Sequence, residues 1–360
     1  MKKRLIIFFA FLTTILSINL YTVSANNYIA KESTIVMEVS TGRVLSSVNQ
    51  DNKMYMASTT KILTAICVIE NCNLDSSVTI KKEWCGIEGS SIYLKENEKL
   101  KVIDLLYGLM LRSGNDTAVS LACYCKGNIN NFALLMNETA KKIGATNSNF
   151  VNPHGLHDDN HYTTAYDLAK ITCYALKNDT FRKIVSTKNI TIENSDGYRR
   201  VLINKNKMLS NYPDCIGVKT GYTKKAGRCL VSASNRNGME VVCVVLNCPN
   251  MYEESCRLLD YANNNYQMKT LVSKSEVLDF VPVKNRKNNF NTSGFIECAV
   301  SVLEDIILPL KRDEVVNICY NIKKSLLAPI KSTEEVGEIN IYSGNNLIFS
   351  QKVYTINNID

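Results

Sequence analysis

The chain has 360 residues, of which 45% are hydrophobic and 21% are charged. This length accommodates two domains, and the composition is that of a globular protein, which excludes an unstructured scaffold. The formal net charge of +8 is mild and spread along the chain. Because nucleic-acid binding requires a basic stripe, we expect no nucleic-acid partner.

The N-terminus has the order of a secretory signal peptide. Basic residues at positions 2–4 precede an apolar run over 5–18, and Val23-Ser24-Ala25 stands where signal peptidase cleaves. We predict a signal peptide over 1–25. The alternative is an uncleaved membrane anchor, because 5–25 approaches the roughly 20 residues of a spanning helix. Both interpretations place the rest of the chain outside the cytoplasm. Without the three basic residues at positions 2–4, the chain has 39 basic and 34 acidic side chains.

The next segments predict helices mixed with an antiparallel sheet. Alternating apolar residues around Ser40-Thr41-Gly42 predict a β-hairpin, and helical periodicity follows Ser58. Further predicted helices are 102–111, a helix starting near 115, and 252–266. The predicted strands are 199–203, 216–220, 229–234 and 240–246, and an Asn-Gly turn joins the last two. We therefore predict an α+β domain over 26–268.

Beyond residue 268 the pattern changes to short strands and polar turns. The clearest feature is a hairpin, with strands over 338–342 and 347–354 around a turn that contains Ser343-Gly344-Asn345-Asn346. We predict a small all-β domain over 275–360. The chain stops directly after a strand, without a basic amphipathic helix, so we expect any membrane association to occur through the N-terminus only.

The thirteen cysteines do not suggest a disulfide framework. Their number is odd and falls below the content of disulfide scaffolds. Cys67, Cys173, Cys229 and Cys243 stand in apolar runs, where a free cysteine behaves as a small buried hydrophobe. The Cys123-Tyr124-Cys125 segment lacks zinc-ribbon spacing, so we predict no metal there.

Ser58-Thr59-Thr60-Lys61 is predicted to begin a helix, where residues three apart lie on one face with Cβ atoms about 5–6 Å apart. A serine hydroxyl needs a base to remove its proton, and lysine can be that base only when it is neutral. Lowering the pKa of a lysine from about 10.4 to 7 or 8 takes roughly 4 kcal/mol, so burial or a nearby cation must supply the shift. The motif alone is weak evidence, because serine commonly caps helices.

Two further motifs strengthen this interpretation. Ser113-Gly114-Asn115 lies between two predicted helices, where the glycine permits a tight turn that projects a hydroxyl and a carboxamide into one cleft. Lys219-Thr220-Gly221 ends a predicted strand and precedes Tyr222-Thr223. There a lysine and a threonine hydroxyl can bind a carboxylate, and glycine lets a substrate backbone lie close along the strand.

These three motifs, in this order, form the pattern described for penicillin-binding proteins and β-lactamases. The sequence resembles the serine D-alanyl-D-alanine carboxypeptidases, the low-molecular-mass penicillin-binding proteins. The resemblance covers about residues 28–266 and includes longer runs, which are 57–61, 106–110, 113–116, 152–156, 161–168 and 217–223. It implies a penicillin-binding/β-lactamase-like catalytic domain, with an antiparallel sheet flanked by helices. The β-rich remainder resembles the family's C-terminal domain.

The resemblance also implies catalytic roles. It makes Ser58 the acylated nucleophile and Lys61 its general base. Ser113 and Asn115 would relay protons to the leaving group and hold the peptide. The backbone N–H groups of Ser58 and Tyr222 would form the oxyanion hole, an element whose loss typically costs about 10² to 10³ in rate.

The remaining matched residues are implied to bind substrate. Lys219 and Thr220 would bind the terminal carboxylate, and the charge of Lys219 would lower the pKa of Lys61. Gly221, Tyr222 and Thr223 would line the strand along which the peptide lies. The implied reaction removes the last D-alanine from a peptidoglycan stem pentapeptide through an acyl-enzyme, and β-lactams would acylate the same serine. No cofactor and no metal are implied.

Three rival functions share parts of this pattern. A β-lactamase needs a deacylating glutamate, but Glu138 and Glu193 are the only glutamates between the second and third motifs, and neither begins a Glu-x-x-x-Asn run. A zinc peptidase is suggested by His154, His157 and His161, although no His-Glu-x-x-His occurs. A catalytically silent cell-wall-binding protein would keep the fold without the reaction, but the complete set of motif side chains argues against it.

Overall fold

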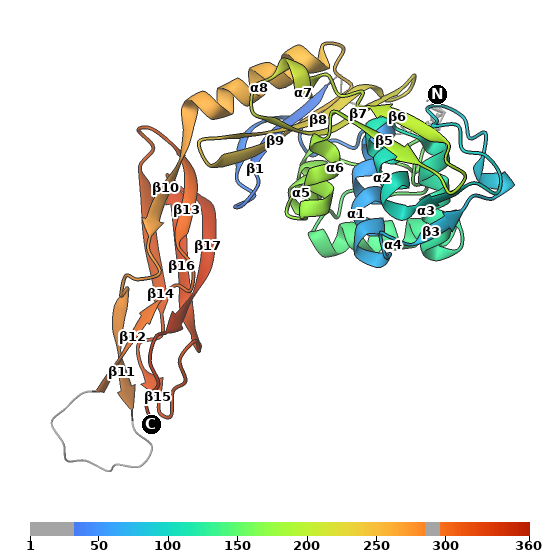
Figure 1. Cartoon of the computed structure of the whole chain (residues 1–360). Helices are drawn as coiled ribbons and strands as arrows, with labels where there is room; N and C mark the ends of the chain where they lie inside the picture. Colours follow the sequence, from blue (N-terminus) through green and yellow to red (C-terminus); the bar gives the residue numbers. More distant parts are fainter. Residues whose placement is uncertain (1–31, 285–295) are drawn as a thin grey trace, which may run out of the picture.

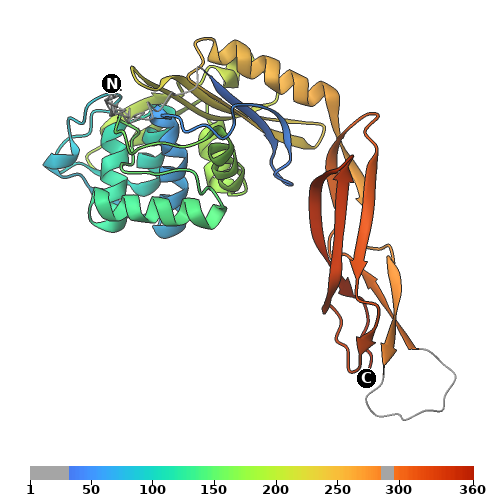
Figure 2. The same cartoon turned by 180° about the vertical axis from the view of Figure 1, so that it is seen from behind.

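The computed structural model describes residues 32–284 and 296–360, so the predicted signal peptide lies outside the described residues. Two domains follow one another and meet at the end of helix α8 (Met251–Asn265) (Figure 1). The first combines a sheet with helices, and the described part of the second consists of strands and connecting turns. Figure 2 shows the second domain projecting away from the first, with the C-terminus at its far end. This is the predicted α+β architecture with a C-terminal β domain.

The first domain is organised around a five-stranded antiparallel sheet. Its strand order is β2-β1-β9-β8-β7, which places β7 at one edge. The strands are β1 (Ser33–Glu38), β2 (Val44–Val48), β7 (Cys215–Thr223), β8 (Gly227–Arg236) and β9 (Met239–Leu246). Because β7 is an edge strand, one side of its backbone is free of the sheet and can face a substrate.

Both faces of this sheet are covered by helices. On β1, Ile35 belongs to the core that helices α1 to α6 form on one face of the sheet. The adjacent Val36 belongs to the core under α8, on the other face. Val244 and Val245 of β9 divide in the same way. The helices opposite α8 are α1 (Lys61–Asn71), α2 (Val102–Leu111), α3 (Asn115–Lys126), α4 (Ile129–Ile143), α5 (Ala165–Leu176) and α6 (Asp179–Ser186).

Short elements complete the first domain. They are two 3-10 helices, η1 (Ala57–Thr60) and η2 (Lys82–Trp84), the short helix α7 (Met208–Asn211), and strands β3 (Ser77–Thr79), β4 (Lys99–Lys101), β5 (Asn189–Glu193) and β6 (Arg199–Ile203). β3 pairs with β4, and β5 pairs with β6.

Most predicted elements are confirmed, with differences at their ends. The predicted helix over 102–111 is α2, and the predicted strand over 199–203 is β6. β7 and β8 are longer than predicted, because their ladder continues through polar residues as far as the Thr223–Gly227 pair. The predicted helix over 252–266 ends one residue early, since Tyr266 pairs with Lys311 in a strand.

The C-terminal domain contains two sheets around one apolar core. The two-stranded sheet consists of β10 (Tyr266–Val272) and β13 (Ile306–Lys311). The six-stranded sheet has the order β14-β16-β17-β12-β11-β15. Its strands are β11 (Asp279–Lys284), β12 (Ile296–Ser301), β14 (Val316–Ile322), β15 (Leu326–Leu327), β16 (Glu335–Ser343) and β17 (Asn346–Thr355). The hairpin of β16 and β17 confirms the predicted one.

Arg43 joins the two domains. Its guanidinium donates to the carbonyl oxygen of Pro309 and to the carboxylate of Glu314, and it lies 5.8 Å from the ring centroid of Tyr266. The hydroxyl of Tyr266 in turn donates to the carbonyl oxygen of Leu45 (3.1 Å). These contacts connect the β1–β2 hairpin to the β domain, so the domains are attached at more than the single chain crossing.

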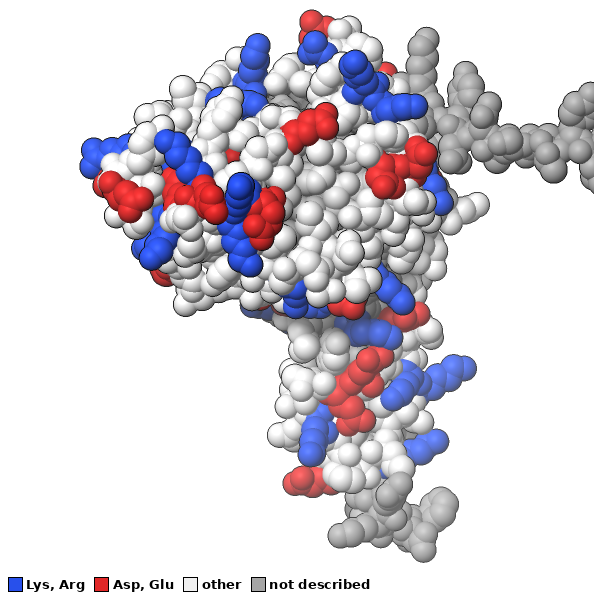
Figure 3. Space-filling model, turned by 90° about the vertical axis from the view of Figure 1, so that its right-hand side faces the viewer, with Lys and Arg blue, Asp and Glu red and all other residues white. Residues whose placement is uncertain are grey.

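Charged side chains of both signs are interspersed on the face drawn in Figure 3, so the mild positive charge is distributed there and not concentrated. All thirteen cysteines lie in the described residues and are free thiols. Cys67, Cys173, Cys229 and Cys243 are buried, as the apolar runs around them predict.

Candidate active site

Ser58 and Lys61 meet as the three-residue spacing predicts, although Ser58 precedes the α-helix. Residues 57–60 form the 3-10 helix η1, and α1 begins at Lys61. Ala57 has a φ of 48°, and the hydroxyl of Thr60 donates back to the Ala57 carbonyl oxygen at 2.8 Å, which tightens the turn. The Nζ of Lys61 lies 3.0 Å from Ser58 Oγ.

Lys61 is completely buried and has three acceptors within hydrogen-bond distance. Besides Ser58 Oγ, Nζ donates to Asn115 Oδ1 (2.7 Å) and to the carbonyl oxygen of His154 (2.6 Å). Burial, followed by the charge of Lys219, lowers the pKa of Lys61 well below its ordinary value. Neighbouring Asp116 opposes this shift, but the net direction favours a neutral amine beside the Ser58 hydroxyl.

The second motif lies in the loop between α2 and α3. Ser113 has a φ of 63° in the left-handed region, and it is almost completely buried at the edge of the cleft. Asn115 begins α3, where its backbone N–H donates to the Ser90 carbonyl oxygen (2.7 Å) and its side-chain amide donates to the Glu88 carbonyl oxygen. These bonds orient the Asn115 carbonyl group toward Lys61.

The third motif lies on the edge strand β7, which passes close to η1. A Cβ at Gly221 would stand 3.0 Å from both the Met56 carbonyl oxygen and the Ser58 backbone nitrogen, so the close approach of the two segments favours glycine. Lys219 is buried, and its Nζ donates to the carbonyl oxygen of Thr220 (2.9 Å). Burial and the charge of Lys205 lower the pKa of Lys219 to about 7.

Ser58 opens into two adjoining cavities of about 470 and 430 Å³. Both are lined by Ser58, Ser90, Lys205 and Tyr222. The larger also contains Ser113, Thr220, Gly221, Arg228, Met251 and Tyr252. The smaller also contains Gly89, Ser91, Tyr93, Arg112, Asn115, His154, Gly155, Leu156 and Thr223. Lys219 lines neither cavity, so of the predicted substrate-binding residues it alone acts from behind the surface.

Comparison with known proteins identifies this arrangement. The sequence profile of the family described as D-alanyl-D-alanine carboxypeptidase matches residues 20–250. The chain belongs to this family. The profile of the C-terminal domain of penicillin-binding protein 5 matches residues 266–360.

Individual carboxypeptidases cover most of the chain. The D-alanyl-D-alanine carboxypeptidase DacF of Bacillus subtilis is 30% identical over 86% of this chain and 80% of its own length. The structure of penicillin-binding protein 5 from Haemophilus influenzae superimposes with a TM-score of 0.77 at 26% identity, over 91% of this chain and 96% of that one. A mutant of the Streptomyces K15 DD-transpeptidase gives a TM-score of 0.61 at 35% identity, over 64% and 96%. The chain is thus a serine-type carboxypeptidase of the penicillin-binding group.

Two of the three histidines of the carboxypeptidase, His154 and His161, take part in hydrogen bonds within the fold. His161 Nδ1 accepts from the Val151 backbone N–H (3.1 Å), which leaves Nε2 to donate to the Thr60 hydroxyl (2.8 Å). His154 Nδ1 accepts from the Leu156 backbone N–H (3.1 Å). In residues 32–284 and 296–360, no three His, Cys, Asp or Glu side chains gather as a possible metal site.

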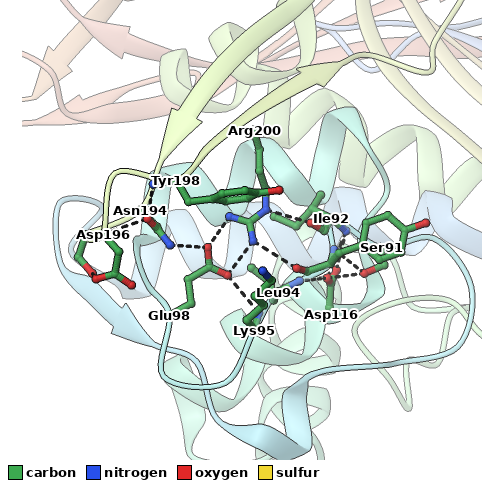
Figure 4. Close-up of polar contacts among 12 residues, drawn as sticks. Ser91, Ile92, Leu94, Lys95, Glu98, Asp116, Asn194, Asp196, Tyr198 and Arg200 are labelled. Atoms are coloured by element: carbon green, nitrogen blue, oxygen red, sulfur yellow. Dashed lines mark hydrogen bonds and ion pairs between the residues drawn. The ribbon is translucent and has the colours of Figure 1, made fainter.

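The loop of residues 88–95, which lines the cleft, is held by buried charges (Figure 4). Arg200 on β6 forms a buried ion pair with Glu98 and donates to the Ile92 and Tyr93 carbonyl oxygens (3.0 and 3.2 Å). From the other side, the carboxylate of Asp116 on α3 accepts from the Ser91 hydroxyl (2.5 Å) and from two backbone N–H groups of the loop.

Several functional residues were missed from the sequence. Lys205 and Arg228 stand outside the three motifs, and only the fold brings them to the cleft lining. Glu98 and Arg200 also stand outside the motifs, and they act on the cleft only through the loop that they hold. Asp116 has a signal in the sequence, because it directly follows Asn115 of the second motif at a helix start. The two glutamates considered for a β-lactamase, Glu138 and Glu193, line neither cavity.

In the described residues, no helix is both long and apolar enough to pass through a membrane.

Proposed function

We propose that the chain removes the C-terminal D-alanine from peptidoglycan stem pentapeptides, with Ser58 as the nucleophile. The observation that carries this proposal is the position of the buried Lys61 amine, 3.0 Å from Ser58 Oγ. A neutral amine takes the Oγ proton as Oγ attacks the carbonyl carbon of the penultimate D-alanine. The C–N bond then breaks, the departing D-alanine takes up a proton, and water hydrolyses the resulting ester on Ser58.

Ser113 and Asn115 act on either side of this step. Ser113 lines the larger cavity with Ser58 and Thr220, so we assign its hydroxyl to proton transfer toward the leaving amine. Asn115 fixes Lys61 through its carbonyl group and lines the smaller cavity, where we place the acyl part of the peptide. The larger cavity then receives the terminal D-alanine.

Strand β7 provides the remaining substrate contacts. The Ser58 and Tyr222 backbone N–H groups form the proposed oxyanion hole, which the close approach of Gly221 to η1 supports. The Thr220 hydroxyl binds the terminal carboxylate, with the charge of Lys219 behind it. Tyr222 and Thr223 extend the strand along which the peptide lies. β-Lactams acylate Ser58 at the same position.

The substrate implies a location outside the cytoplasmic membrane. We propose that residues 1–25 direct export as a signal peptide or remain as an anchor, and that the enzyme limits cross-linking of the cell wall. The catalytic domain extends to the end of α8, and we place the domain boundary at Tyr266, where β10 begins.

Mass spectrometry of a pentapeptide ending in D-alanyl-D-alanine, incubated with the purified protein, tests the proposal. The expected result is the loss of one terminal alanine, which Ser58→Ala abolishes. A fluorescent penicillin should label the wild type and not Ser58→Ala. A wild-type protein that neither shortens the peptide nor binds penicillin would indicate the silent cell-wall protein.

A further inference from the structure

Two cysteine thiols meet where helices α1 and α3 end. Cys72 follows the last residue of α1, and its backbone N–H donates to the Val68 carbonyl oxygen (3.0 Å), which closes that helix. Cys125 lies in the last turn of α3, which ends before Gly127 (φ 80°). The Cys72 thiol donates to the Cys125 sulfur. Regular backbone at both helix ends thus holds the two sulfur atoms side by side.

This contact makes the two thiols unequal. Because the Cys72 S–H group stabilises a thiolate at Cys125, the hydrogen bond lowers the pKa of Cys125; burial opposes this shift, and the charge of Lys126 adds to it. The same hydrogen bond, followed by burial, raises the pKa of Cys72. The thiolate is the nucleophile in thiol–disulfide exchange. Cys125 is therefore the thiol that attacks first, and Cys72 is the thiol that follows.

The surroundings single out this pair among the nearby cysteines. Cys72 and Cys125 pack against the apolar core but are only half-buried, which leaves access for a small solute. Cys67 on α1 is completely buried, and burial raises its pKa to about 12, so it does not compete. Cys123 also lies on α3, but its sulfur accepts from the indole N–H of Trp84 instead of facing Cys72.

We propose that Cys72 and Cys125 form a redox-active dithiol, which a low-molecular-mass disulfide converts into an intrachain disulfide that braces α1 against α3. The Cys125 thiolate attacks one sulfur of the oxidant, forms a mixed disulfide and releases the first thiolate. Cys72 then loses its proton and attacks the Cys125 sulfur, which expels the second thiolate. Two cysteine thiols are thereby oxidised to one disulfide, and the oxidant is reduced to two thiols, which take up the two protons.

The brace joins the far ends of the two helices that carry Lys61 and Asn115. These residues begin α1 and α3, and Lys61 Nζ lies 2.7 Å from Asn115 Oδ1. Because α1 has eleven residues, Cys72 lies about 16 Å from its start. The disulfide therefore fixes the helix pair without contacting the cleft. It also closes a long loop between residues 72 and 125, which restricts the unfolded chain and stabilises the folded one.

The test uses the full chain after reduction with dithiothreitol and removal of that reagent. The protein is incubated with oxidised glutathione, its remaining thiols are alkylated, and its peptides are analysed by mass spectrometry. One cross-link is expected, between Cys72 and Cys125. It should raise the midpoint of thermal unfolding by about 5–10 °C, and dithiothreitol should reverse the rise. A wild type without this cross-link would overturn the proposal, and a cross-link without the rise would refute the brace.

Single variants test the order of attack. Cys72→Ser should stop at a glutathione adduct on Cys125, whereas Cys125→Ser should form its adduct on Cys72 more slowly. Adducts that form equally fast would contradict the assignment of Cys125 as the attacking thiol. Cys123→Ser is the matched control, because it removes another half-buried thiol of α3 and should keep both the cross-link and the rise in midpoint. The corresponding alanine variants repeat the comparison if a serine variant folds poorly.

Discussion

Glu98 and Arg200 form an ion pair inside the catalytic domain, with side chains that are 3% and 8% exposed. The pair connects two segments about a hundred residues apart, the loop that lines the cleft and the β5–β6 hairpin (Figure 4). Asn194 at the end of that hairpin donates to the same carboxylate (2.9 Å). The cleft wall at Ser90 and Tyr93 thus depends on a charge that cannot be solvated where it lies.

Glu98→Gln should therefore destabilise the fold strongly. Removing one partner leaves the Arg200 charge buried without compensation, which typically costs about 3–5 kcal/mol in the free energy of unfolding. Urea denaturation measures this value, and labelling with a fluorescent penicillin measures the accompanying loss of acylation. The exposed pair of Glu193 and Arg199 is the control, since Glu193→Gln should cost at most about 1 kcal/mol. Similar small losses for both variants would contradict the structural role of the buried pair.

The pH dependence of acylation should report the pKa of Lys61. Burial and then the charge of Lys219 lower that pKa, and acylation requires the neutral amine, so the rate falls as the pH drops through it. Lys219→Gln removes the second cause. The pKa of Lys61 then rises, and the acidic limb of the rate profile moves to higher pH. Second-order rate constants for penicillin acylation between pH 5 and 9 test this shift, independently of the lower rate expected for the variant.

Lys225→Gln provides the control for that profile, because Lys225 is exposed and lines neither cavity. It should leave the acidic limb in place. An acidic limb that stays at the wild-type pH in Lys219→Gln would show that Lys219 does not act on Lys61.

The sequence predicts the parts of this site that depend on local spacing. Ser58 and Lys61 are three residues apart at a helix start, so their contact follows even though the first turn is a 3-10 helix. Lys219 and Thr220 are neighbours on one strand, so their side chains point to opposite faces of the sheet. The burial of Lys219 was not predictable in the same way, because it depends on the layers that cover β7.

Contacts between distant segments could not be derived from patterns. In the sequence, Arg228 is an ordinary polar residue after a turn. Only the pairing of β8 with β7 brings it beside the cleft. Lys61 also donates to the backbone carbonyl oxygen of His154. Every residue has such an oxygen, so the sequence does not indicate which one takes this role. Family resemblance supplied the approximate architecture, but it gave no indication of these particular supports.

His161 should make the fold sensitive to acid. Burial first lowers its pKa from 6.5 to about 4, so the folded state keeps it neutral while the unfolded state binds a proton. The resulting stability is complete above pH 6.5 and is lost as the pH falls toward 4, amounting to about 3 kcal/mol. His161→Gln, which can still accept from Val151 and donate to Thr60, should flatten this part of the profile of unfolding free energy against pH.

The partly exposed His157 offers the comparison for that experiment. His157→Gln should retain the wild-type loss of stability between pH 6.5 and 4, measured by urea denaturation at each pH. If His161→Gln retained it as well, the acid sensitivity would have to arise from other groups, among them His154, whose pKa burial lowers to about 3.

Gly221→Ala tests whether the approach of β7 to η1 forms the catalytic centre. The added Cβ would lie 3.0 Å from the Ser58 nitrogen and 3.1 Å from the Thr59 nitrogen, which are backbone atoms that cannot turn away. The strand must then move outward, which separates the Ser58 and Tyr222 N–H groups that we assign to the oxyanion hole. Because losing one such donor typically costs about 10² to 10³ in rate, acylation by penicillin should fall by a similar factor.

The fold itself should tolerate Gly221→Ala better than the reaction does. Overpacking of this kind costs about 1–3 kcal/mol, and the other strand pairings of the sheet do not depend on Gly221. Thermal unfolding and penicillin labelling of the same preparation separate the two effects. Gly238→Ala is the control, since it strains a turn glycine (φ +80°) where a Cβ meets no atom within 4 Å, far along the β8–β9 hairpin. It should lower stability but leave acylation of the folded protein unchanged, and equal acylation by Gly221→Ala and wild type would refute the proposed oxyanion hole.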